Sequence, residues 1–131
     1  MSCVYLSSED ILVIAGYACD DMQIVVRDAG LLESAVHRPS VATFGEEAYP
    51  DLIDKAAALL QSLGNRHLRP LCGDNRRAAW LSCVTFLAMN GVDLQPDIDA
   101  AERLVIDVAT GETDEIKVIS QELRNLVVDA M

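Results

Sequence analysis

The chain has 131 residues and a mass of 14.2 kDa, the size of one domain. Hydrophobic residues make up 51% of it and the mean hydropathy is +0.22, which excludes a disordered chain despite a formal net charge of −11. The longest uncharged stretch, residues 78–92, is shorter than the about 20 residues that cross a bilayer. No Lys or Arg precedes Arg27, as the basic start of a signal peptide would require. We therefore expect one soluble, cytoplasmic domain over residues 1–131.

Six segments have the apolar periodicity of helices, and only residues 105–110 are rich enough in β-branched side chains to leave a strand as an alternative. Ser7 and Asp10 have the spacing of a capping box, and Gly64 and Gly111 stand where glycine commonly ends a helix. In chain order the predicted helices lie between Ser7 and Asp20, from Ala29 to Val36, from Pro50 to Gly64, from about Asn75 to Asn90, from Asp97 to Gly111 and from Thr113 to Val127.

These helices predict an all-α fold, a compact helical bundle. Residues 75–90 are apolar on nearly every side, so we expect this helix at the centre of the bundle. Residues 41–49 form a loop longer than the usual ~4–6 residues, which is typical of functional loops. The four cysteines, at positions 3, 19, 72 and 83, form no CxxC pair, and we expect reduced thiols that are mostly buried.

The basic residues are distributed unevenly along this acidic chain. Residues 1–64 and 78–131 each hold ten acids and three bases, whereas residues 65–77, NRHLRPLCGDNRR, hold four arginines and one acid. These arginines could form ion pairs with the acidic remainder of the molecule. The alternative is a binding site for a small, compact anion, which does not depend on long-range attraction.

The second half of this basic segment coincides with the predicted start of a helix. The first N–H groups of a helix lack internal partners, and with the helix dipole they favour a phosphate. Gly73 lets the backbone approach an anion closely, and Arg76 and Arg77 can add charge-assisted hydrogen bonds. An ordinary turn capped by Asp74 or Asn75 would use the same donors.

Two further side chains of the segment suit chemistry at a phosphate. Asp74 is its only acid and could hold Mg²⁺ together with substrate phosphates, or it could simply cap the helix. His67 is a candidate general base for an attacking hydroxyl, with a surface or capping histidine as the alternative. His37 stands beside Pro39 and has no such neighbours.

At this point the residues resemble those of the Doc (death on curing) toxins of the Fic superfamily, over nearly the whole chain. Residues 27–35 read R-D-A-G-L-L-E-S-A, residues 44–50 read F-G-E-E-A-Y-P like the family's flap, and residues 80–94 resemble its buried helix. The active loop of the family reads H-P-F/L-x-D-G-N-K-R, and residues 70–77 read P-L-C-G-D-N-R-R. The resemblance implies the Fic/Doc fold with a central buried helix and a short flap.

The chain departs from the family loop at two places. Gly73 and Asp74 stand in the reverse order, and the position six residues before Asn75 is Arg69 rather than histidine. Counted from the preceding helix, however, His67 falls where the histidine of the family does. Either two residues are inserted after a working His67, or arginine replaces the base, which it cannot do because it does not deprotonate in proteins.

The resemblance implies a toxin that transfers the γ-phosphoryl group of ATP to a hydroxyl of a translation factor, elongation factor Tu, and so blocks translation. Gly73, Asn75, Arg76 and Arg77 would then bind the nucleotide, Asp74 would hold Mg²⁺, and His67 would be the catalytic base. It also implies a Phd-like antitoxin as a partner and a flap that docks the target segment, for which an added strand is one mode.

Three alternatives stay open at this level. The chain could transfer AMP to a protein hydroxyl, as most Fic-fold proteins do. It could be catalytically inactive and bind only its antitoxin. A DNA-binding helix-turn-helix built from residues 55–64 and 75–90 is disfavoured by the charge of −11, and we expect no direct nucleic-acid partner and no membrane.

Overall fold

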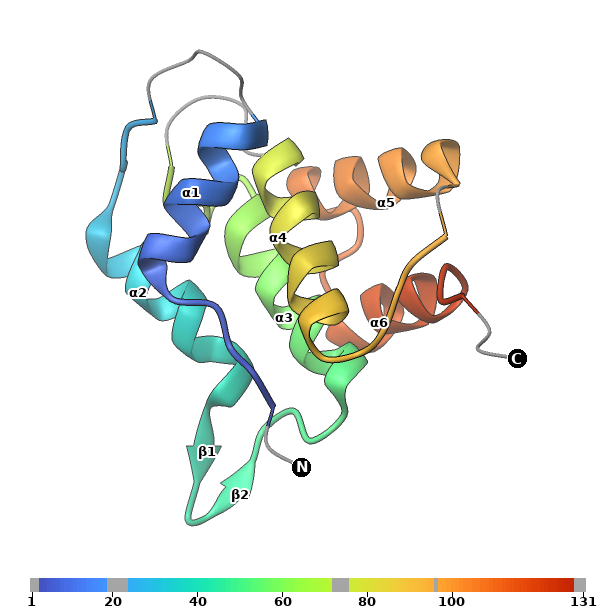
Figure 1. Ribbon diagram of the computed structural model, residues 1–131, viewed down its shortest axis with the longest axis horizontal. Helices are drawn as coiled ribbons and strands as arrows, with labels where there is room; N and C mark the ends of the chain where they lie inside the picture. Colours follow the sequence, from blue (N-terminus) through green and yellow to red (C-terminus); the bar gives the residue numbers. More distant parts are fainter. Residues whose placement is uncertain (1–2, 19–23, 72–75, 96, 129–131) are drawn as a thin grey trace.

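A computed structural model describes residues 3–18, 24–71, 76–95 and 97–128, and it shows a compact helical bundle (Figure 1). The predicted all-α fold is confirmed, with one small two-stranded hairpin as the only sheet in these ranges. No helix of the described chain is long and apolar enough to cross a membrane. The elements are α1 (Ser8–Ala18), α2 (Ala29–His37), a short 3-10 helix η1 (Arg38–Ser40), β1 (Ala42–Thr43), β2 (Glu46–Glu47), α3 (Leu52–Gly64), α4 (Arg76–Met89), α5 (Ile98–Thr110) and α6 (Ile116–Arg124).

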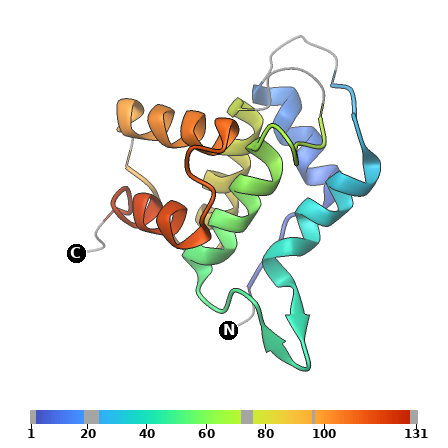
Figure 2. The ribbon, with the colours of Figure 1, turned by 180° about the vertical axis from the view of Figure 1, so that it is seen from behind.

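The helix at the centre of the bundle is α3, with α2, α4, α5 and α6 packed around it (Figures 1 and 2). All of its residues from Ile53 to Gly64 are buried except Asp54. The sequence had indicated the helix near 75–90 for this position, but α4 exposes Leu81 and Met89. The difference arises because α3 buries polar side chains with partners inside the fold, which a hydrophobic pattern does not anticipate.

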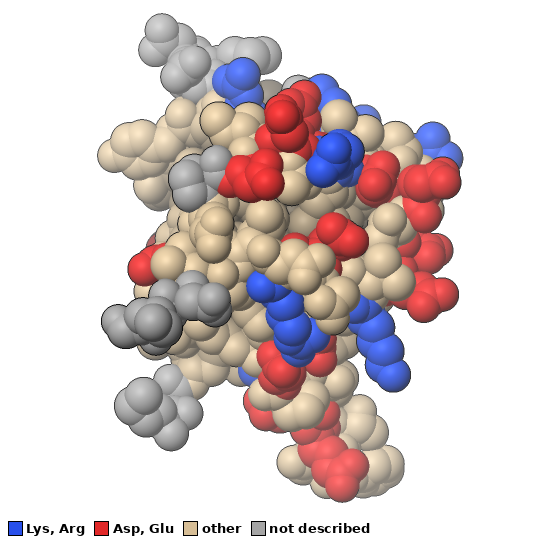
Figure 3. Space-filling view, turned by 90° about the vertical axis from the view of Figure 1, so that its right-hand side faces the viewer, with Lys and Arg blue, Asp and Glu red and all other residues tan. Residues whose placement is uncertain are grey.

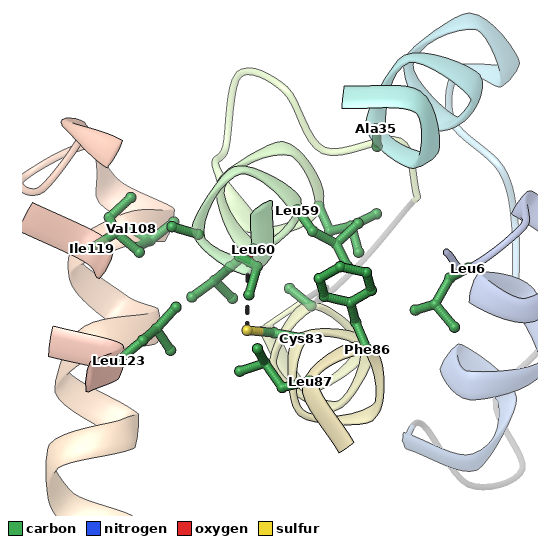
Figure 4. Packing of buried hydrophobic residues seen from close by; sticks show 14 of the residues in the cluster. Leu6, Ala35, Leu59, Leu60, Cys83, Phe86, Leu87, Val108, Ile119 and Leu123 are labelled. Carbon is green, nitrogen blue, oxygen red and sulfur yellow. Dashed lines mark hydrogen bonds between the residues drawn. The ribbon is translucent and has the colours of Figure 1, made fainter. Parts of the chain in front are cut away.

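The core forms where α3, α4 and α6 meet (Figure 4). Leu59 and Leu60 of α3 pack with Phe86 of α4, and all three side chains are at most 1% exposed. α3 and α4 lie close where Gly64 meets Ala79, since a Cβ on Gly64 would lie 3.2 Å from the Ala79 Cβ. The short side chains thus allow the two helices to pack tightly.

The buried thiol of Cys83 belongs to this core and donates a hydrogen bond to the Ala56 carbonyl at 3.7 Å (Figure 4). Burial raises the pKa of Cys83 to about 12, so the thiol stays protonated and unreactive. Cys3 is a free, half-buried cysteine, whereas positions 19 and 72 lie outside the described residues.

The predicted helix ends agree with the structure in most places. The Ser7 hydroxyl accepts from the Asp10 N–H at 3.1 Å and the Asp10 carboxylate from the Ser7 N–H at 2.9 Å, which completes the capping box. Asp97 caps α5, and Gly111 ends it with φ +84°. Residues 105–110 are helical, not extended.

Two helices differ from prediction at their ends. Asp51, not Pro50, sets the start of α3, because its carboxylate accepts the Ile53 N–H at 2.8 Å. α6 begins at Ile116 and ends at Arg124, which is shorter at both ends than the expected span of 113–127.

The segment 41–49, expected as a loop, is a β-hairpin that protrudes from one end of the bundle (Figure 1). Ala42 pairs with Glu47 and Thr43 with Glu46, which leaves a two-residue turn. Both turn residues, Phe44 and Gly45, have positive φ, at +52° and +80°, as a type I′ turn requires. The Phe44 side chain is fully exposed at the tip.

Candidate functional site

The described residues of the basic segment, 65–71 and 76–77, lie at the end of the bundle where α3 ends and α4 begins (Figures 1 and 2). Arg76 and Arg77 form the first turn of α4 and are exposed. Gly73, Asp74 and Asn75, which complete the predicted anion site, lie outside the described residues. Their assigned roles stay predictions.

Both arginines line a cavity of about 650 Å³ between α4 and α5. Trp80 faces the same cavity, because residues three and four apart share one side of a helix. Aliphatic side chains such as Val105 cover much of the remaining wall. A cavity of this size, lined by two cations and an aromatic ring, suits an anionic ligand that carries a flat organic group.

The charges around this cavity are mixed. No hydrogen bond or ion pair joins Arg77 to another residue of the described chain, so its guanidinium is available to an external anion. Asp97 and Glu102 also line the wall. The Asp97 carboxylate is occupied by the Ala100 N–H at 3.1 Å, which makes it a helix cap.

The four arginines of the basic segment do not all line the same cavity. Arg66 and Arg69 do not line the cavity that Arg76 and Arg77 share. Arg66 donates its backbone N–H to the Ala109 carbonyl at 3.0 Å, and it forms no ion pair with a carboxylate in the described ranges. The alternative of pairing with the acidic remainder therefore does not apply to Arg66 or Arg77.

The loop after α3 is fastened to a distant part of the chain. The Arg27 guanidinium donates to the Arg69 carbonyl from Nε at 2.9 Å and from Nη2 at 2.5 Å. The Pro70 carbonyl accepts hydrogen bonds from the N–H groups of Arg27 and Asp28 at 2.7 and 3.1 Å. Val26 and Leu71 form an isolated antiparallel β-bridge. These contacts fix the course of the loop immediately after His67.

His67 is exposed, and its backbone is held by the Asn65 side chain. The Asn65 amide is itself buried and donates to the Val108 carbonyl at 3.2 Å. The Nε2 atom of His67 accepts a hydrogen bond from the Arg66 Nε–H at 3.3 Å. An accepting Nε2 carries a lone pair, which is the state that a general base needs.

The structure thus brings Arg76 and Arg77 together but does not place His67 on the wall of their cavity. His37, which sequence reasoning set aside, is exposed and lies 3.7 Å from Glu33 on the same helix. Trp80 was missed as a site residue because it was assigned to the core. Its spacing of three and four residues from the two arginines is the signal that could have revealed it.

The described residues contain no group of three or more His, Cys, Asp or Glu that could hold a metal ion by itself. Mg²⁺ bound to a nucleotide needs only one or two carboxylates beside the phosphates. The exposed carboxylate of Glu102 on the cavity wall is of the right chemical kind, and Asp74 stays the predicted ligand.

The face over α5 and α6 shows acidic and basic side chains interspersed, with no continuous basic area (Figure 3). A nucleic-acid-binding surface would gather its Lys and Arg side chains on one face or along one helix. This face therefore lacks the electrostatic signature of a DNA interface.

Comparison with known proteins identifies a relative of this chain. No family model matches the chain. It is similar to a protein named Toxin Doc from Mycolicibacterium smegmatis, with 48% identity over 112 residues, which cover 84% of either chain. Identity at that level across most of both chains establishes a common family and agrees with the motifs at residues 27–35 and 70–77. The chain belongs to the family of Doc toxins.

Proposed function

We propose that this toxin transfers the γ-phosphoryl group of ATP to a hydroxyl of elongation factor Tu and thereby blocks translation. As a Doc toxin it is part of a toxin–antitoxin module and has an antitoxin partner, which we propose is Phd-like and meets it in the cytoplasm. The observation that carries the proposal is the pair Arg76 and Arg77 on the wall of the cavity of about 650 Å³ that Trp80 also lines. Phosphoryl transfer asks a protein mainly for such positioning and charge stabilisation.

In the proposed reaction, each residue of the candidate site has a separate role. The oxygen of the accepting hydroxyl attacks the γ-phosphorus, the bond from that phosphorus to the β–γ bridging oxygen breaks, and ADP leaves. His67 accepts the hydroxyl proton at Nε2, after release from Arg66. Arg76 and Arg77 hold phosphate oxygens, together with the backbone at Gly73 and Asn75. Mg²⁺, held by Asp74 and the phosphates, would neutralise charge on the nucleotide.

The test is mass spectrometry of purified elongation factor Tu after incubation with the toxin, ATP and Mg²⁺. We expect a gain of one phosphate, and we expect His67→Ala to abolish it. A gain of AMP would replace the proposal by nucleotide transfer through the same cavity. No modification, with the parent and His67→Ala alike, would identify a catalytically inactive toxin.

Nucleotide binding can be measured without the protein substrate. Arg77→Ala and Arg76→Ala should each weaken ATP binding by about 1.5–3 kcal/mol, which is a factor of roughly 10–150, because each removes a charge-assisted hydrogen bond. Arg103→Ala is the matched control, since Arg103 is exposed on α5 and does not line the cavity. If calorimetry gives all three variants the affinity of the parent, the phosphates bind elsewhere.

A further inference from the structure

A second cavity, of about 440 Å³, lies between α2 and the C-terminal half of α3, beside the first strand of the hairpin. Its wall combines the aliphatic side chains of Leu31, Ala35, Val41 and Leu68 with polar groups, among them Arg38 and Ser62. No Asp or Glu of the described chain lines it. In a molecule of charge −11, this wall carries the permanent positive charge of Arg38, and an acid near it, Glu33, is directed at His37 at 3.7 Å.

Arg38 is half-buried, and every partner of its guanidinium is neutral. Nη1 donates to the Ser62 Oγ at 3.0 Å and to the Ala58 carbonyl at 3.5 Å. Nε donates to the Tyr49 hydroxyl at 3.3 Å, and the guanidinium carbon lies 5.8 Å from the centre of the Tyr49 ring. Within the described ranges no carboxylate pairs with it, and the two Nη2 donors have no partner.

Such a cation lacks the anion that partly buried charges normally have. A guanidinium cannot lose its proton, so it cannot relieve the cost of burial by becoming neutral. Its Nη2 can still donate charge-assisted hydrogen bonds to a carboxylate oxygen. An oxyanion from outside the chain would complete the site.

The surroundings favour a carboxylate on a polypeptide over a free anion. The aliphatic part of the wall suits the methylene groups of an acidic side chain, whereas a small inorganic ion would leave it unfilled. The neighbouring strand β1 also offers backbone groups. Since the Ala48 N–H bonds the Val41 carbonyl at 2.9 Å, the alternation of an antiparallel pair turns the N–H and C=O of Ala42 away from β2.

We propose that this cavity binds an acidic side chain of an extended segment of the protein substrate, with the carboxylate on Arg38 and the backbone of the segment along the free edge of β1. Assigning the segment to the substrate rests on the proposed function. The binding itself does not, because it requires neither ATP nor transfer. Arg38 is thus a specificity-determining residue, whose charge selects which segment is presented.

The direct test observes the Nε–H signal of Arg38 in the full chain by NMR while peptides are added. The probes are the acetylated and amidated peptides Thr-Val-Glu-Val-Thr and Thr-Val-Gln-Val-Thr, and inorganic phosphate, all at one ionic strength. We expect the glutamate peptide to shift the signal to saturation and the glutamine peptide to bind about tenfold more weakly, because it lacks the charge. Equal affinities would overturn the proposal. A saturable response to phosphate without one to the glutamate peptide would also overturn it and identify a free-anion site.

A substitution of Arg38 itself would also remove its hydrogen bonds within the fold. Ser34→Glu is expected to block the site while Arg38 stays in place. Ser34 is exposed, lines the cavity and precedes Arg38 by four residues, so a carboxylate there can occupy the guanidinium. Ala88→Glu is the matched control, because it adds the same charge at an exposed position of α4 outside the cavity. We expect the first variant to lose the peptide response and the second to keep it; equal responses would contradict the assignment.

The experiments can refute the transfer to elongation factor Tu and the anion site at Arg38 independently of each other. Binding of the glutamate peptide without any modification of elongation factor Tu would leave the anion site in place and remove the proposed substrate. Modification of that factor at an undiminished rate by Ser34→Glu would leave the transfer in place and remove the role of Arg38.

Discussion

Phe44 occupies the position in the described backbone that least suits its residue type. It is the only residue other than glycine with positive φ there, at +52°, and its ring packs against nothing. A left-handed conformation costs an L-residue roughly 1–2 kcal/mol, and less for asparagine. The hairpin thus carries a local cost at its tip.

Phe44→Asn should relieve this cost. The turn would become Asn followed by Gly45, the sequence most favoured for type I′, and we expect the protein to gain up to about 1 kcal/mol in free energy of unfolding. Tyr17→Asn is the control, because it removes an equally exposed aromatic ring from a helix. Urea denaturation that ranks Phe44→Asn at or below the parent would show that the turn is not strained.

Asp51 shows how one carboxylate serves two helices. It caps α3, and it accepts a hydrogen bond from Arg124 at the end of α6 at 2.7 Å. Burial by itself raises the pKa of Asp51, but the hydrogen bonds from the Ile53 N–H and from Arg124 outweigh it, and the pKa lies below its usual 3.8. The stabilisation is therefore present above pH 3.8 and is lost as the pH falls through the lowered value.

Asp51→Asn keeps a good cap but removes the charge. At neutral pH we expect a loss of about 0.2–1 kcal/mol, since the pair is nearly half exposed, and we expect this loss to vanish in acid, where the parent is protonated. Asp51→Ala also removes the cap and should cost about 1 kcal/mol more. Urea midpoints across a pH series check both. A loss for Asp51→Asn that is independent of pH would rule out the charge as its origin.

Residue types predicted the site only in part. Two adjacent cations at a helix start predicted an anion site at Arg76 and Arg77, and both residues line one cavity. Arg66 and Arg69 were grouped with them by sequence distance, but neither lines the shared cavity. The role of Arg38 could not be read at all, because a lone arginine before proline has no pattern and its neutral partners come from residues 49–62.

At the scale of elements, α3 positions the hairpin through a buried lysine. Lys55 is 3% exposed, and its Nζ donates to the Glu47 carboxylate at 2.9 Å and to the Pro39 carbonyl at 3.1 Å. Burial by itself lowers the pKa of Lys55, but the hydrogen bonds and charge interactions with Glu47 and Tyr5 together outweigh it, and the pKa is raised above 10.5. The contribution of this contact is therefore complete below pH 10.5 and is lost as the pH rises through the raised value.

Lys55→Met keeps the methylene chain and removes both hydrogen bonds. We expect a loss of about 1–3 kcal/mol in the free energy of unfolding and faster amide exchange at Ala48, since the base of the hairpin is released. Lys117→Met is the matched control, because Lys117 is exposed on α6. A loss no greater than that of the control would mean that the hairpin is held by its own turn.

Helix ends were predictable because caps are local chemistry. Ser7 with Asp10, Asp97 and Gly111 each act within three or four residues, and each was assigned correctly. Packing is not local: the burial of Lys55 and Ser62 in α3 depends on partners at Glu47 and Arg38. Residues 41–49 were predicted as a loop because strands of two residues are too short to show the alternating pattern of a β-strand.

The net charge of the whole molecule disfavours binding to a polyanion such as DNA. With a formal charge of −11 and mixed charges over α5 and α6, the chain repels a polyanion (Figure 3). We expect the chain alone to give no shift with DNA in a gel at low salt, where electrostatic binding is strongest. A lysozyme lane serves as the basic control, and a sequence-specific shift would revive the helix-turn-helix alternative.

The fastening of the loop after His67 bears on how this chain could be divided or recombined. The carbonyls of Arg69 and Pro70 accept hydrogen bonds from Arg27 and Asp28, about forty positions earlier in the chain. Residues 26–28 therefore support the loop that leads into α4. A chimaera between two such toxins would keep its geometry only if both halves of this clasp came from the same parent.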